Sequence, residues 1–142
     1  MNQLLLDTDV VLDFFLDRQH FAEDATRILA LCEEQQLQVF VTPVSISNVY
    51  YILRKLGSHS KVITHLKQLL TLVEVASVHK EVVLEALESD FKDFEDALQH
   101  FAAKSEPSIQ LIITRNLKDY SKSSLAVMTP VAYLKFRNAA CD

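Results

Sequence analysis

Acidic and amide side chains gather at three places along this chain, and these places hold its capacity for chemistry. Asp7 and Asp9 directly follow the apolar run 4–6, Asp93 and Asp96 lie three residues apart, and Asn116 follows the apolar run 109–114. Clustered carboxylates repel one another unless a hard cation compensates their charge. An all-oxygen cluster suits Mg²⁺ or Mn²⁺, which can activate water and stabilise charge on a phosphodiester. The residue types therefore indicate a metal-dependent hydrolytic site.

The elements that position these residues alternate along the chain. Apolar runs predict strands at 3–7, 37–42, 72–76, 109–114 and 126–128. Periodic segments predict helices at 9–17, 20–35, 44–56, 59–71, 80–88, 91–104 and from Thr129 onward. Strands that are apolar on both faces indicate a parallel sheet covered on both sides. We expect one domain over 1–142, a three-layer α/β/α sandwich of about five parallel strands, with polar residues beyond the carboxyl ends of the strands.

Several local expectations follow from the same segments. Ser45 or Ser47 is expected to cap the helix 44–56, and Gly57 to end it. Cys32 falls on the apolar face of its helix and is expected in the core. His100 follows Asp96 by one helical turn and is expected to be exposed.

Composition excludes several classes of protein. Gly57 is the only glycine, so neither a phosphate-binding loop nor a dinucleotide fingerprint can be built. The net charge of -5 argues against a general polyanion binder. It permits a nuclease with a local basic rim, for which the candidates are Arg115, Lys118, Arg54 and Lys55.

The sequence also sets expectations about location. No apolar run approaches the ~20 residues that a membrane span needs. Asp7 and Asp9 interrupt the first apolar segment, which argues against a signal peptide. The two cysteines show neither metal-ligand nor redox spacing. We therefore expect a cytoplasmic protein without membrane contact.

Four segments, in this order, resemble the motifs of PIN domains. They are the hydrophobic-Asp-Thr-Asp opening at 4–9, the acidic helix DFEDAL at 93–98, the segment IITRN with KDY at 112–120, and the closing MTPVAYL at 128–134. The resemblance implies a five-stranded parallel sheet and Mg²⁺- or Mn²⁺-dependent endoribonuclease activity on RNA. It often implies a homodimer, and many small bacterial members, the VapC-type toxins, are neutralised by an antitoxin.

Two positions depart from the pattern of PIN domains. Asn48 stands where the family usually has a Glu on the helix after the second strand, and Asn116 stands at the fourth acidic position. An amide oxygen can ligate a hard cation but brings no charge. The two losses of charge therefore either weaken metal affinity or shift the burden to Asp9, Asp93 and Asp119. By resemblance, Asp7, Asp96, Asp93, Asn48 and Asn116 form the metal site, Asp7, Asp93, Asp96 and Asn116 carry catalysis, and Asp9 and Asp119 are the further carboxylates.

Other interpretations of these residues stay open. Asp7 and Asp9 can stabilise the start of a helix, the favoured role for Asp9, and Asp93 and Asp96 can form a solvated helix face. The amides favour a PIN module that binds RNA or a protein without cleaving. The opening Asp-Thr-Asp-Val-Val also matches phosphohydrolases of the haloacid-dehalogenase type, although the near absence of glycine argues against that class.

Overall fold

The protein is built on a five-stranded parallel sheet, described in a computed structural model for residues 2–141. The strands are β1 (Asn2–Leu6), β2 (Leu37–Val41), β3 (Glu74–Val75), β4 (Leu111–Ile113) and β5 (Ala126–Met128). Their order is β3-β2-β1-β4-β5, which places β1 in the centre with β2 and β4 as its parallel neighbours. The order reverses beside β1, so a cleft is expected at the carboxyl end of this strand.

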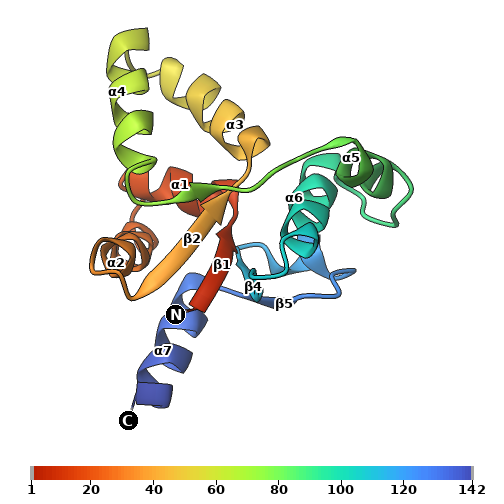
Figure 1. Ribbon diagram of the computed structural model, residues 1–142. Coiled ribbons are helices and arrows are strands. Elements are labelled where there is room, and N and C mark those ends of the chain that lie inside the picture. The colour runs from red at the N-terminus through yellow and green to blue at the C-terminus, as the bar shows by residue number, and fades with distance from the viewer. Residues whose placement is uncertain (1, 142) are drawn as a thin grey trace.

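Helices connect the strands and cover both faces of the sheet. They are α1 (Thr8–Phe15), α2 (Ala22–Glu33), α3 (Pro43–Arg54), α4 (His59–Leu69), α5 (Lys80–Leu87), α6 (Phe94–Ser105) and α7 (Pro130–Cys141), with a 3-10 helix η1 (Leu117–Tyr120). Figure 1 shows α1 to α4 on one side of the central strands, α5 and α6 on the other, and α7 beside both chain ends.

Alternation along β1 divides the core into two layers. Leu4 and Leu6 face the larger apolar cluster, which includes residues of α1 to α4 and of α7. Leu5 faces the opposite cluster, where Ala103 of α6 and Ile112 of β4 pack against it. Helix α5 lies outside α6, against a third small cluster. The predicted three-layer sandwich is confirmed, although β3 and β4 are shorter than the predicted strands.

Two helix starts differ from the predicted ones because side chains outside the apolar pattern cap them. Helix α3 is capped by Thr42, whose hydroxyl accepts a hydrogen bond of 3.0 Å from the Ser45 amide, so the expected serine cap is wrong. Pro43 occupies the favoured first turn. Helix α6 begins at Phe94 because the Asp93 carboxylate accepts a hydrogen bond of 3.0 Å from the Asp96 amide.

The expected exposure of His100 is also wrong. Its side chain is 2% exposed and packs against the rings of Phe91 and Phe101. Its Nδ1 lies 3.1 Å from the hydroxyl of Ser123. Burial lowers the pKa of His100 to about 4, so this imidazole is neutral at physiological pH. Cys32 is buried, as expected. Within residues 2–141, no helix is both long and apolar enough to cross a membrane.

Replacing Ile112 by Ala is expected to destabilise the fold by about 2–5 kcal/mol, the usual loss when a buried isoleucine leaves a cavity. Ile112 is fully buried in β4 and packs in the layer under α6. Chemical denaturation with urea measures the loss. Val131→Ala on α7 is the control, because Val131 is 46% exposed and its truncation should change the free energy of unfolding little. Equal effects of both substitutions would contradict this account of the core.

Candidate active site

A groove of about 500 Å³ opens at the carboxyl edge of the sheet, where β1 and β4 end and α1 and α6 begin. Its walls carry six carboxylates and two amides: Asp7, Asp9, Asp93, Glu95, Asp96, Asp119, Asn48 and Asn116. The structure thus brings all five predicted metal-site residues to one groove. It adds Glu95, which sequence reasoning missed.

Asp7 lies at the base of the groove and is almost completely buried. Its Oδ1 accepts hydrogen bonds from the Thr8 amide (2.8 Å) and from Nε2 of Gln99, and its Oδ2 accepts one from the Thr114 hydroxyl (2.7 Å). Burial is the main cause that raises the pKa of Asp7, and the charge of Glu95 adds to it. Oδ2 has one protein donor, so one of its lone pairs stays available to a cation.

Gln99 fixes the orientation of Asp7 and was not predicted. This side chain is fully buried, and its Oε1 accepts a hydrogen bond of 2.9 Å from the Thr42 hydroxyl. The bonds join α6, the start of α3 and the end of β1. The one signal in the sequence was the position of this amide among the small and apolar residues of the segment 97–103.

Asp9 connects α1 to the turn that follows β4. It lies in the first turn of α1, as a helix-stabilising role requires. Its Oδ2 also accepts hydrogen bonds of 3.1 Å from the Arg115 amide and from Nδ2 of Asn116. Oδ1 is buried and has no hydrogen-bond partner among the described residues. Burial, followed by the charge of Asp7, raises the pKa of Asp9 to about 7.

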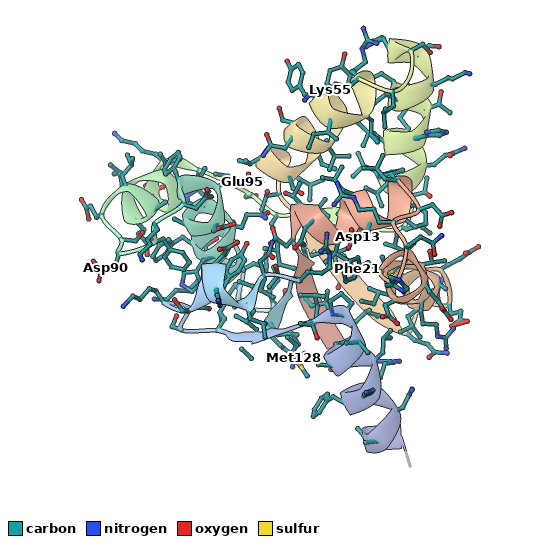
Figure 2. The ribbon with its side chains drawn as sticks, turned by 180° about the vertical axis from the view of Figure 1, so that it is seen from behind. Asp13, Phe21, Lys55, Asp90, Glu95 and Met128 are labelled. Atoms are coloured by element: carbon teal, nitrogen blue, oxygen red, sulfur yellow. The ribbon has the colours of Figure 1, made fainter. Side chains whose placement is uncertain are left out.

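The start of α6 presents consecutive carboxylates to the groove. Partial burial raises the pKa of Asp96 to about 8, with further contributions from Asp7, Asp93 and Asp119, in that order. Asp93 is exposed and caps α6. Glu95, which directly precedes Asp96, is half-buried, and its Oε1 lies 2.9 Å from the Thr8 hydroxyl. In Figure 2, Glu95 lies between α6 and α3.

The four predicted basic residues occupy different surroundings. Arg115 binds the buried Asp13 through Nε (2.6 Å) and NH2 (3.0 Å), and its guanidinium lies 4.0 Å from the centre of the Phe21 ring. Both partners are labelled in Figure 2. Because Asp13 is 1% exposed, this ion pair has a structural role that the sequence did not reveal.

Lys118 adjoins the groove, since it lines a small pocket that shares Asp96 and Asp119 with it. Arg54 donates a hydrogen bond of 2.9 Å to the Gly57 carbonyl at the end of α3. Figure 2 shows Lys55 at that same distant end. A basic rim at the groove is therefore narrower than the sequence suggested.

The donors of the groove suit a hard divalent cation. Among the described residues, no three Asp, Glu, His or Cys side chains stand close enough to ligate one ion in their present rotamers. Mutual repulsion keeps carboxylates apart where no cation compensates them. Asp9 Oδ1 and the Tyr120 hydroxyl are buried near Asp7 and have no hydrogen-bond partner within residues 2–141, and three carboxylates have raised pKa values. These features indicate uncompensated negative charge that a cation would relieve.

The chain belongs to the PIN domain family, because the sequence model of the PIN domain matches residues 3–118. This confirms the resemblance of its motifs. Among individual relatives, the chain is 26% identical over 124 residues to Ribonuclease VapC1 of Aquifex aeolicus (strain VF5), which covers 84% of this chain and 85% of that protein.

Solved structures share the fold. A toxin-antitoxin complex from Klebsiella pneumoniae contains a chain that matches with a TM-score of 0.67 and 22% identity, over 89% of this chain and 97% of that one. VapC20 of Mycobacterium tuberculosis, a sarcin-ricin loop cleaving toxin, matches with a TM-score of 0.58 and 18% identity, over 77% of this chain and 86% of that one.

Proposed function

We propose that this protein is an Mg²⁺- or Mn²⁺-dependent endoribonuclease that hydrolyses phosphodiester bonds in RNA. The observation that carries the proposal is the convergence of Asp7, Asp96 and their acidic neighbours on one groove. Membership of the PIN domain family supports it, as does the similarity to a protein named a ribonuclease.

Asp7 and Asp96 would hold the ion, with Asp93, Asn48 and Asn116 assisting directly or through water. When bound, the ion supplies positive charge that stabilises the phosphodiester in its transition state. Asp7 is held rigidly by Gln99 and Thr114, so its free lone pair has a fixed direction. Asp96 is half-exposed and, once ionised, can accept the proton of an attacking water at its carboxylate. Lys118 lines the pocket beside the groove and would attract a neighbouring phosphate of the RNA.

The partners of this chain are part of the same proposal. A chain of similar fold occurs in a toxin-antitoxin complex, and another occurs in a VapBC2 complex of Rickettsia felis bound to promoter DNA. These similarities support a toxin that is neutralised by an antitoxin. The proposal also includes a homodimer and a cytoplasmic location, which the resemblance to PIN domains and the sequence imply. The second candidate function is a PIN module that binds RNA or protein without cleavage. Asn48 and Asn116 favour it, because each brings an uncharged amide to the groove.

Cleavage of a labelled RNA in Mn²⁺ tests the proposed function. Asp96→Asn is expected to slow cleavage about a hundredfold or more, since it removes a carboxylate that both binds the ion and accepts a proton. EDTA should abolish the activity of the natural protein. Asp17→Asn is the control, because Asp17 is exposed and its positive φ of 49° is tolerated by Asn. Intact RNA that the protein nevertheless binds would favour the second candidate.

A further inference from the structure

One wall of the groove brings no charge of its own. Helix α3 contributes Asn48, Tyr51 and Ile52, and none of these side chains is a carboxylate. The negative charge on this side comes instead from Glu95, the second residue of α6. A glutamate at the start of a helix usually extends into solvent, where its charge is hydrated at no cost.

Hydrogen bonds direct Glu95 towards the helix α3 side. Its Oε1 lies 2.9 Å from the Thr8 hydroxyl, which lies 2.9 Å from the hydroxyl of the fully buried Ser45. Thr8 begins α1 and Ser45 belongs to the first turn of α3. This connection holds the carboxylate above the junction of the two helices and close to Asp7, a charge that repels it.

The consecutive residues Glu95 and Asp96 diverge on the helix. Glu95 contacts Thr8 at the start of α1, whereas Asp96 also lines the small pocket beside the groove, together with Asp119 of η1. Asp7 follows the end of β1 and lines the same groove as Glu95 and Asp96. Carboxylates from three separate segments therefore line one groove. A hard cation that takes oxygen ligands from several directions would draw them together.

A buried group beneath these carboxylates independently points to a missing ligand. The Tyr120 side chain is 2% exposed, and its hydroxyl has no hydrogen-bond partner among residues 2–141. This hydroxyl lies within the influence of the Asp7 and Asp96 charges, which raise its pKa further than burial alone. Buried hydroxyls are normally satisfied. An ion with its bound water molecules would supply both a partner for the hydroxyl and compensation for the carboxylates.

We propose that Glu95 is a ligand of the divalent metal ion and supplies the charge that α3 lacks. This inference rests on the proposed metal-dependent function. It assigns to Glu95 a role in metal binding equal to that of Asp96. The Thr8 hydroxyl then acts as a positioning group that holds the carboxylate on the α3 side.

Calorimetric titration with Mn²⁺ tests the assignment through a charge relocation. E95Q is expected to bind Mn²⁺ about tenfold or more weakly than the natural protein, because one ligand charge is lost. The double variant E95Q/N48E places a carboxylate on the same side of the groove from α3 and should regain most of the affinity. E85Q removes an exposed glutamate of α5 and should bind like the natural protein. Unchanged affinity of E95Q overturns the inference, and a double variant as weak as E95Q overturns the placement of the charge.

Two further measurements keep the outcomes separate. Circular dichroism melting shows whether E95Q is folded, and if it is not, E95D replaces it. E95D keeps the charge but is shorter by one methylene. We therefore expect E95D to bind Mn²⁺ measurably, but more weakly than the natural protein and E85Q do. E95D affinity equal to that of the natural protein counts against the inference. Failure of the natural protein to bind Mn²⁺ at millimolar concentration overturns the proposed function, and with it this assignment.

Discussion

Asp7→Asn is expected to reduce the rate of RNA cleavage about a thousandfold or more, because it removes several kcal/mol of transition-state stabilisation. The same variant is expected to melt at the temperature of the natural protein or above it. A loss of activity without a loss of stability is the pattern that separates a group selected for chemistry from one that supports the fold.

The physical reason lies in the surroundings of Asp7. Asparagine has the same shape, and its carbonyl oxygen can keep the hydrogen bonds from the Thr8 amide and Gln99. Its NH₂ group can donate to the Thr114 hydroxyl, which rotates to accept instead of donating. The substitution removes a buried carboxyl group whose pKa is raised by desolvation. The folded state therefore no longer bears the cost of burying its charge.

Single-turnover cleavage and thermal melting, measured on the same preparations, check this expectation. Asp17→Asn serves as the matched control, since it makes the same chemical change at an exposed position. Retention of a tenth or more of the natural rate in Asp7→Asn would remove Asp7 from the catalytic site. A large drop in melting temperature would show that its carboxylate is a structural group.

The sequence was sufficient to predict the layers of the fold and the edge at which the site lies. The buried runs that form β1, β2 and β4 are continuous and apolar, and parallel strands expose their carboxyl ends at one edge. Asp7 and Asn116 were therefore expected at the same edge, and the pairing of β1 with β4 brings them to one groove. Local pattern alone determines both conclusions.

The details that the sequence missed depend on contacts between distant segments. Gln99 reaches Asp7 across 92 positions of the chain, and Arg115 reaches Asp13 across 102. No periodicity reveals such pairs, because the pattern of a segment does not show which distant side chain a polar residue will meet. His100 was placed on the surface for the same reason, whereas the ring of Phe91, from outside its helix, covers it.

Metal-free protein is expected to lose stability as the pH rises from 6.5 to 9, and saturating Mn²⁺ is expected to cancel this loss. The pKa of Asp9 is raised from 3.8 to about 7 and that of Asp96 to about 8. Between the unfolded value and these folded values, the folded state binds more protons than the unfolded state. The free energy of unfolding therefore falls with increasing pH until both groups are ionised. Because Asp96 is half-exposed, we expect a decrease in melting temperature of only about 2–5 °C.

The lower limit of this range follows from His100. Its pKa is lowered to about 4 in the folded state, so it favours folding increasingly as the pH rises towards 6.5 and contributes a constant amount above that value. Above pH 6.5, Asp9 and Asp96 change the free energy of unfolding as the pH rises, whereas His100 does not. The Asp9→Asn/Asp96→Asn variant lacks both carboxylates, so its melting temperature should fall less across the range than that of the natural protein.

Melting curves in EDTA and in Mn²⁺ at pH 6.5, 7.5 and 9 measure the effect. Protons and Mn²⁺ compete for the oxygens of Asp96, and ionised Asp9 adds negative charge near the ion, so the increase in melting temperature on adding Mn²⁺ should grow with pH. A melting temperature in EDTA that rises with pH would contradict the raised pKa values. An equal Mn²⁺ effect at every pH would instead place the ion away from Asp9 and Asp96. The pH dependence of metal stabilisation thus reports on the groove itself, independently of whether the correct RNA has been found.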